Sequence, residues 1–175
     1  TRLNRLDSAK VWKERSEEML QKLVEKLFDE QHMPIIFDNN TQEVFHVQST
    51  LVFAPLALGK RLPKEIRETM IRCLTDGNYI HEAGLATEPT NSSYYKEDGF
   101  FRGPIWWNTT LLIAEGLRVC GEEKLAKEVA KKFCDTVAKE YCCAECFNVH
   151  SGKAYNNKSY TPTAGTFLAL PRFYF

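Results

Sequence analysis

The chain has 175 residues, 43% hydrophobic and 26% charged, which is typical of a globular protein long enough to bury a substantial core. Its 23 Lys and Arg residues balance 23 Asp and Glu residues, which argues against a nucleic-acid or anionic-membrane partner, since either calls for a basic surplus. No apolar run approaches the roughly 20 residues of a membrane-spanning helix. The chain opens without a signal-peptide pattern and without Met, so we expect a cytoplasmic protein and a processed or excised piece.

Apolar residues recur at three- and four-residue steps through most of the chain, which predicts an all-α fold. The expected helices span residues 8–28, 44–58, 64–74, 104–120, 125–138 and 164–170. Asp7 or Ser8 can cap the first of them, and Pro63 fits the start of the third. Pro104 fits the start of the fourth helix, and Gly121 fits its end.

The connectors between these helices alternate between long and short. The long ones cover residues 29–43, 78–103 and 141–160. In stacked antiparallel helix hairpins, alternate connectors lie at opposite ends of the stack, so we expect the long loops together at one end. Long structured loops at one end of a rigid scaffold are where function usually sits.

The cysteines include one cluster, Cys142, Cys143 and Cys146, with His150 four residues further on. A structural zinc site usually needs two spaced ligand pairs, and no second pair exists in the sequence. We therefore expect no metal, no other cofactor and reduced thiols.

The stretch from Tyr94 to Thr110 mixes aromatic rings with Arg102, two carboxylates, two glycines and a proline. Aromatic faces beside convergent hydrogen-bonding groups suit a sugar, because its C–H face stacks on a ring while its hydroxyls need polar partners. The alternative is a turn-rich loop that aromatic packing holds in place.

Glu145 has small, apolar or aromatic neighbours in Cys143-Ala144-Glu145-Cys146-Phe147. Partial burial of that kind can hold a carboxylate in a defined position for chemistry. A capping or salt-bridging glutamate, with Arg102 as its partner, explains the position equally well. We expect Arg102 to lie within reach of the Glu145 region, and Trp106 to face the same cleft.

Two segments carry a resemblance to a known family. Gly99-Phe100-Phe101-Arg102-Gly103-Pro104-Ile105-Trp106-x-Asn108-Thr109 resembles the "G-Y-W-R-G-P-I-W-x-x-T" signature of glycoside hydrolase family 63 and its mannosylglycerate-hydrolase-like relatives. Ala144-Glu145-Cys146-Phe147-Asn148-x-x-Ser151-Gly152 resembles the family's "A-E-N-F/Y-x-x-x-T-G" segment, and trehalases carry a comparable "E-K-Y-D". The match runs from about residue 9 to residue 170 in the family's order.

The resemblance implies an inverting α-glycosidase built on an (α/α)6 toroid of antiparallel helix hairpins. It implies that Glu145 is the general base and that a sugar subsite is lined by Phe101, Arg102, Trp106, Asn108 and Tyr160. The implied substrate is an α-linked glucosyl or mannosyl oligosaccharide or a small glycoside. Inversion needs two carboxyl groups about 6.5–9.5 Å apart, one to protonate the leaving oxygen and one to activate a water.

The resemblance is incomplete in two ways. Phe100, Phe101 and Pro162 replace aromatic residues of the family pattern, which leaves the sugar open. The family's general acid lies in a loop upstream of the matching region, and Asp7 falls at a helix start. We therefore expect residues 1–175 to be the C-terminal portion of one catalytic domain, with the N-terminal half of the toroid as its partner and no activity as an isolated fragment. The alternative is a non-catalytic carbohydrate-binding or helical interaction module.

Overall fold

The computed structural model describes residues 5–175. Contacts between residues divide the chain into two compact units, with the boundary between His46 and Val47. The fold is all-α apart from a few two-residue strands. In residues 5–175, no helix combines the length and the apolar character that crossing a membrane requires.

The first unit consists of one long helix and a small hairpin. Helix α1 (Leu6–Leu27) begins after Arg5 without a side-chain cap, so the expected cap by Asp7 or Ser8 is wrong. Strands β1 (Ile36–Phe37) and β2 (Val44–Phe45) pair antiparallel. The carboxylate of Asp38 closes the turn between them by accepting hydrogen bonds from the N–H groups of Asn40 and Thr41.

The second unit begins with η1 (Thr50–Arg61), a run of 3-10 turns, followed by helix α2 (Lys64–Asp76). The expected helix over residues 44–58 is therefore wrong at its start, since residues 44–45 form β2. Its helical part is also not a regular α-helix. Pro55 has no N–H to donate within it, and Gly59 breaks it with φ 56° and ψ −134°. Helix α2 does follow Pro63 directly, as expected.

Helices α3 (Trp107–Cys120), α4 (Glu123–Glu140) and α5 (Thr161–Tyr174) complete the second unit. Helix α3 contacts η1, α4 and α5. The four-residue steps of α4 bury its core side chains, with Val129 and Phe133 fully buried and Phe133 packed against Phe147 of the following loop. Helix α5 is longer than the expected 164–170 at both ends. Its earlier start is compatible with Pro162 in the first turn, where a missing N–H costs nothing.

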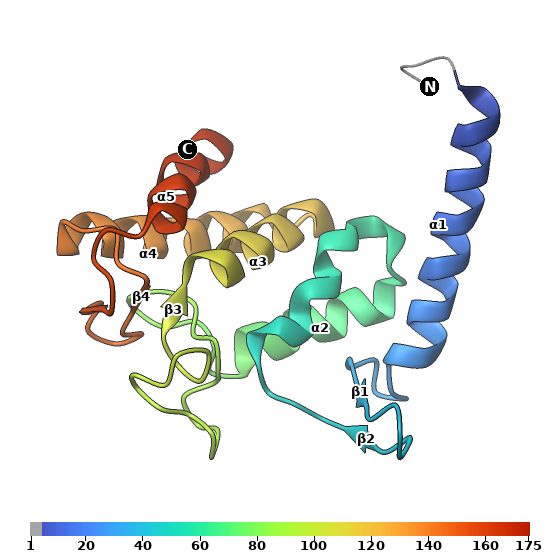
Figure 1. Cartoon of the computed structure of the whole chain (residues 1–175), viewed down its shortest axis with the longest axis horizontal. Helices are drawn as coiled ribbons and strands as arrows, with labels where there is room; N and C mark the ends of the chain where they lie inside the picture. The colour runs from blue at the N-terminus through green and yellow to red at the C-terminus, as the bar shows by residue number, and fades with distance from the viewer. Residues whose placement is uncertain (1–4) are drawn as a thin grey trace. The chain divides into compact units, whose positions relative to one another are not determined.

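A three-stranded antiparallel sheet of β3 (Ile105–Trp106), β4 (Cys146–Phe147) and β5 (Ala154–Tyr155) joins two of the long loops. Helix α3 therefore starts at Trp107 and not at Pro104, because residues 105–106 pair with β4. The loops 78–103 and 141–160 lie on the same side of α3 and α4 (Figure 1), which confirms the expectation for these two.

The close approach of α3 to η1 depends on Gly116. A Cβ atom at this position would lie 2.9 Å from Cβ of Leu56 and 3.1 Å from its carbonyl carbon. We expect Gly116→Ala to lower the free energy of unfolding by about 1–3 kcal/mol, because overpacking outweighs the gain in helix propensity. Gly165 of α5 is the matched control, because nothing lies within 4 Å of its added Cβ, and Gly165→Ala should stabilise by about 0.5–1 kcal/mol. Urea unfolding of both variants tests this, and a stable Gly116→Ala would contradict the packing.

Candidate active site

The pairing of β3 with β4 brings the aromatic stretch next to the Glu145 segment. Trp106 lies opposite Cys146 in the register, so Glu145 adjoins the strand that pairs with Trp106. The backbone on both sides of Glu145 is fixed. In the peptide group before it, the Glu145 N–H donates to the carbonyl of Asn157 and the Ala144 carbonyl accepts the Thr163 hydroxyl, and after it Cys146 pairs within the sheet. Two motifs about 40 positions apart in the sequence thus form one structural unit.

Phe100, Phe101 and Trp106 form an aromatic cluster at this edge. The rings of Phe101 and Trp106 stack with centroids 4.3 Å apart, and Phe100 packs edge-on against both. Trp106 is only 3% exposed, so the expectation that its own ring faces an open cleft is wrong. The exposed ring of the cluster is Phe100, which is 53% exposed and whose carbonyl accepts the indole N–H of Trp106 at 2.8 Å.

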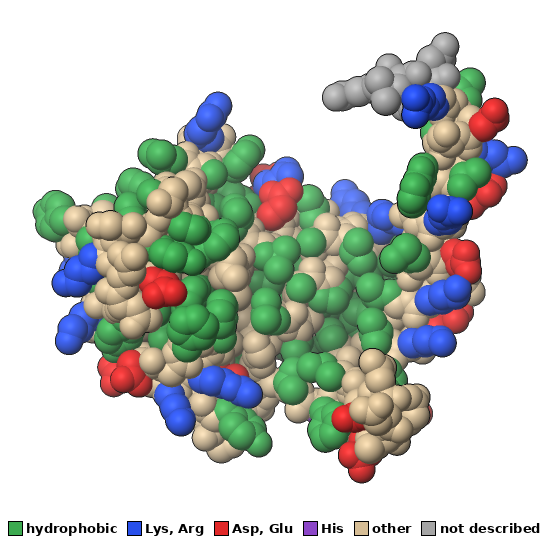
Figure 2. Space-filling view, in the orientation of Figure 1, with side chains coloured by type: hydrophobic (Ala, Val, Ile, Leu, Met, Phe, Trp, Pro, Cys, Tyr) green, Lys and Arg blue, Asp and Glu red, His purple; other side chains and the backbone are tan. Residues whose placement is uncertain are grey.

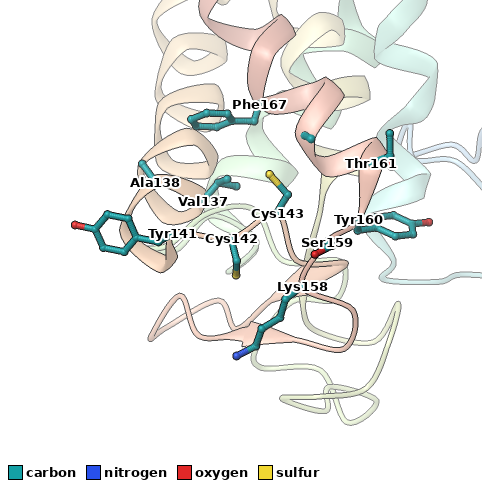
Figure 3. A pocket seen from close by; sticks show the side chains of 11 residues that line it. Val137, Ala138, Tyr141, Cys142, Cys143, Lys158, Ser159, Tyr160, Thr161 and Phe167 are labelled. Carbon is teal, nitrogen blue, oxygen red and sulfur yellow. The ribbon is translucent and has the colours of Figure 1, made fainter.

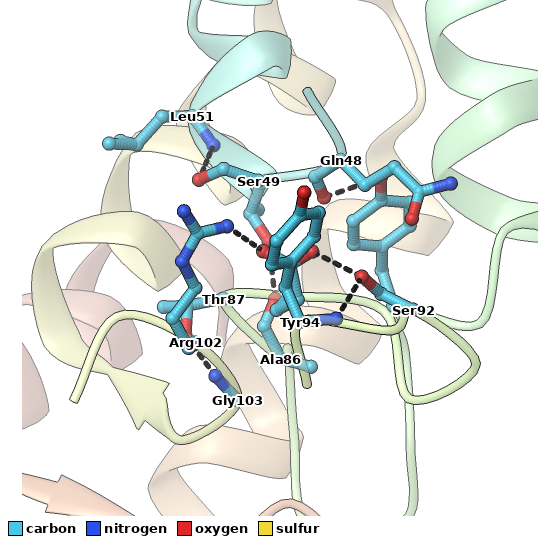
Figure 4. Close-up of polar contacts among 12 residues, drawn as sticks. Gln48, Ser49, Leu51, Ala86, Thr87, Ser92, Tyr94, Arg102 and Gly103 are labelled. Carbon is cyan, nitrogen blue, oxygen red and sulfur yellow. Dashed lines mark hydrogen bonds and ion pairs between the residues drawn. The ribbon is translucent and has the colours of Figure 1, made fainter. Parts of the chain in front are cut away.

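Arg102 pairs with Glu88 and not with Glu145. Its Nη1 donates to Oε2 of Glu88 at 3.1 Å, and its guanidinium lies 5.1 Å from the ring centre of Tyr94 (Figure 4). Within residues 5–175, neither a hydrogen bond nor an ion pair joins Arg102 to Glu145. Arg102 therefore does not bond directly to Glu145. Its partner is the buried carboxylate of Glu88, which was not predicted as a site residue from the sequence.

Asn148 ties the two loops together. Its amide Nδ2 donates to Oε1 of Glu97 at 2.6 Å and to the hydroxyl of Tyr155 at 3.0 Å. Its Oδ1 accepts the N–H groups of His150 and Ser151, which closes the turn after β4. The side chain is almost fully buried, so each of its polar atoms has a partner where water cannot reach. Asn148 therefore fixes the loop of Glu97 against the loop of Glu145.

Glu145 is half-buried between the fully buried neighbours Ala144 and Cys146. Its carboxylate has neither a hydrogen bond nor an ion pair to another side chain in the part of the chain that the structure describes. Burial, and after it the nearby charge of Glu145, raises the pKa of the Cys146 thiol to about 11. Cys146 is therefore a neutral thiol near pH 7, where a nucleophilic cysteine would need to be a thiolate.

Tyr160 and Asn108 lie at the margins of this unit. The N–H of Tyr160 donates to the carbonyl of Cys143, and its side chain lines an open pocket of about 740 Å³ between the end of α4 and the start of α5 (Figure 3). Cys142, Cys143 and Phe167 line the same pocket. Asn108 is half-buried in the first turn of α3, where its Oδ1 accepts the N–H of Thr109.

All six cysteines are free thiols in the structure. In residues 5–175 no group of three or more His, Cys, Asp or Glu side chains is arranged to hold a metal ion.

Two residues at this site were missed by sequence reasoning, Glu88 and Asn148. Glu88 lies in Ala86-Thr87-Glu88-Pro89, a run of small and uncharged neighbours like the one that singled out Glu145. The same argument, applied a second time, would have found it. Nothing local marks Asn148, because its partners Glu97 and Tyr155 come from other segments.

Comparison with known proteins identifies the family. A family model for the mannosylglycerate hydrolase MGH1-like glycoside hydrolase domain matches residues 1–163. The chain belongs to this family. The resemblance of the two signature segments is thereby confirmed. No curated protein sequence matches the MGH1-like chain closely enough to count as a relative.

Solved structures share the fold of the MGH1-like chain at low sequence identity. The family 63 mannosylglycerate hydrolase of Thermus thermophilus, solved with glucose, has a TM-score of 0.70 at 22% identity over 83% of this chain and 34% of its own. Neutral trehalase Nth1 of Saccharomyces cerevisiae has a TM-score of 0.73 at 17% identity over 92% of this chain and 30% of its own. The expected fold, part of an (α/α)6 toroid, is confirmed. The chain spans only about a third of the length of these structures.

Proposed function

We propose that residues 1–175 are the C-terminal portion of one (α/α)6 catalytic domain, and that this domain is an inverting α-glycosidase. The proposed substrates are α-linked glucosyl or mannosyl oligosaccharides or small glycosides. Glu145 is the general base of this proposal, Phe101, Arg102, Asn108 and Tyr160 line the sugar subsite, and the buried Trp106 supports it from behind Phe101. The observation that carries it is the β3–β4 pairing, which sets the aromatic stretch beside Glu145 in a chain of the MGH1-like family.

The proposed chemistry is the attack of water on the anomeric carbon. The carboxylate of Glu145 takes a proton from the water while the bond from the anomeric carbon to the leaving oxygen breaks, and a second carboxyl group protonates that oxygen. Two features of Glu145 favour this role. Its backbone is fixed on both sides, and no side chain of residues 5–175 occupies the oxygen atoms that would accept the proton.

The aromatic cluster suits one wall of the subsite. Phe100 and Phe101 offer apolar faces, and Trp106 supports them from behind through the stack with Phe101 and the hydrogen bond to the Phe100 carbonyl. A sugar stacks its C–H face on such a wall, while a guanidinium like that of Arg102 supplies donors for its hydroxyl groups.

The second carboxyl group and the rest of the toroid belong, in this proposal, to a part of the catalytic domain outside residues 1–175. Exposed apolar side chains of α5 and of the residue that follows it support a missing neighbour. Leu168, Phe173 and Phe175 are each about two-thirds exposed, and Figure 2 shows hydrophobic side chains over this part of the molecule. A helix in a closed toroid would bury such side chains against the next helix pair.

The proposal predicts the stereochemistry of the product and the failure of the isolated chain. The complete catalytic domain should release the β-anomer of glucose or mannose from 4-nitrophenyl α-glycosides, as read by NMR in the first minutes of reaction. The 175-residue chain should give no enzymatic turnover, because it lacks the acid, and acid catalysis is worth about 10²–10⁴-fold. Release of the α-anomer would contradict inversion, and sugar binding without turnover by the complete domain would favour the carbohydrate-binding module.

A further inference from the structure

Glu88 is an acidic side chain with no exposed surface, in a loop beside the proposed sugar subsite. Its Oε1 accepts the Ser92 hydroxyl at 2.6 Å, and its Oε2 accepts Nη1 of Arg102 at 3.1 Å (Figure 4). A carboxylate taken out of water is costly unless such partners replace the lost hydration. Both oxygen atoms of Glu88 are therefore occupied within the chain, and neither is open to a substrate.

The backbone around this ion pair is fixed by hydrogen bonds between two segments. The N–H of Thr87 donates to the carbonyl of Gly103, and the N–H of Gly103 donates to the Thr87 hydroxyl. That hydroxyl in turn donates to the carbonyl of Pro104 at 2.9 Å. The segment that carries Glu88 and the segment that carries Arg102 are thus held together immediately next to the two side chains.

The two partners differ sharply in exposure. The Glu88 side chain is fully buried, while the Arg102 side chain is 51% exposed. The ring of Tyr94 lies 5.1 Å from the guanidinium carbon and restrains it from a second direction. A guanidinium has five N–H donors in a rigid plane, Glu88 accepts from one of them, and the others have no acceptor within residues 5–175.

An arginine that is free on the surface must lose side-chain motion before it can bind a sugar, and that loss lowers the affinity of the site. A buried carboxylate removes that cost in advance, because it fixes the plane of the guanidinium while the fold forms. It also cancels the charge of Arg102, so the pair offers N–H donors without a net charge, which suits neutral hydroxyl groups.

We infer that Glu88 is a positioning residue, which acts through Arg102 by holding the guanidinium so that its free N–H groups meet the hydroxyls of the bound sugar. The inference rests on the proposed function. It assigns the buried carboxylate a role in substrate binding that is separate from the chemistry of Glu145, and it makes Arg102 the only route by which Glu88 acts.

A double-mutant cycle in the complete catalytic domain tests this, with 4-nitrophenyl α-glucoside and α-mannoside as substrates. Glu88→Gln keeps the shape and an acceptor oxygen but removes the charge, and Arg102→Gln removes the guanidinium while leaving an amide to donate to Glu88. We expect Glu88→Gln to lower kcat/KM about 10–100-fold, mainly through KM, because a displaced or mobile donor costs on this order. In the Arg102→Gln background the same change should alter kcat/KM by less than about twofold.

Equal losses of kcat/KM in the two backgrounds would overturn the inference, because Glu88 would then act independently of Arg102. An unchanged kcat/KM in Glu88→Gln would also overturn it, because Glu88 would then have no role beyond the fold. If Glu88→Gln does not fold, Glu88→Asp takes its place in the cycle with the same two outcomes, since it keeps the charge but draws the carboxylate back from the guanidinium of Arg102. Glu82→Gln, an exposed loop glutamate, is the matched control and should keep the wild-type kcat/KM.

The proposed function can fail separately from this inference. Turnover that survives Glu145→Gln overturns the role of Glu145 and leaves the Glu88 cycle readable. If the domain binds methyl α-glucoside or methyl α-mannoside but does not cleave substrate, the cycle is read in Kd by calorimetry. A folded domain that neither binds nor cleaves overturns both.

Discussion

Glu145→Gln is expected to lower kcat of the complete catalytic domain by about 10²–10⁴-fold with little change in KM. Glutamine keeps the size of the side chain and its hydrogen-bonding capacity, but it cannot take a proton from the attacking water. The fold should be undisturbed, because the Glu145 carboxylate bonds to no side chain within residues 5–175. The limb of the pH–rate profile on the acid side, where the base is protonated, should disappear in the variant.

Steady-state kinetics and thermal unfolding of the same samples measure this. Glu82→Gln is the matched control, since it makes the same chemical change in the neighbouring loop. A Glu145→Gln variant with normal kcat would assign the base to another carboxylate. A fall in kcat matched by a large fall in Tm would show that Glu145 holds the loop and does no chemistry.

The second large effect is expected for Asn148→Asp, which should lower the free energy of unfolding by about 2–4 kcal/mol at pH 7. The change replaces the amide that donates to Glu97 at 2.6 Å and to Tyr155 at 3.0 Å with a carboxylate that cannot donate while ionised. It also sets a new negative charge at the buried position 148 against the negative charge of the exposed Glu97. The exposed side of Glu97 screens part of that repulsion, which keeps the expected loss below the cost of a fully buried like-charge pair.

The loss of unfolding free energy in Asn148→Asp should depend on pH in a defined direction. Burial and Glu97 both raise the pKa of the introduced carboxyl above its unfolded value of about 3.9. Above the raised pKa the full penalty applies, and it shrinks as the pH falls through that value toward about 3.9, because the protonated carboxyl regains a donor. Urea unfolding at about pH 7 and about pH 5 measures the difference from wild type. Asn91→Asp, at an exposed loop position, is the control and should show no such dependence.

Local pattern was sufficient to predict α2, α3 and α4 within a few residues, because their apolar faces repeat at helical spacing. It failed at residues 44–49 and 104–106. Helix α3 begins three residues later than predicted, because residues 105–106 pair with residues 146–147 of a distant segment. The local sequence around residue 105 gives no indication of that pairing. In η1, the missing N–H of Pro55 and the kink at Gly59 outweighed an apolar pattern that otherwise favours a helix.

The prediction that the loops 78–103 and 141–160 meet followed from connector lengths alone, and the structure confirms it. The pairing of side chains within those loops did not follow. Arg102 bonds to Glu88, 14 positions away, because the hydrogen bonds of Thr87 with Gly103 and Pro104 fix the two segments side by side. Which carboxylate meets an arginine depends on such backbone geometry, and a sequence does not display it.

The hydrogen bond from the Trp106 indole reaches the main-chain carbonyl of residue 100, while the side chain of Phe100 contributes only ring packing. This main-chain hydrogen bond therefore does not depend on the side chain at position 100, provided that the residue there tolerates a φ of 53°. Phenylalanine adopts that conformation at some energetic cost, and Asn, Asp or Gly adopts it more readily. Position 100 is thus a place where an exposed apolar ring could be exchanged for a polar or a smaller side chain while the main-chain hydrogen bond to the Trp106 indole is kept.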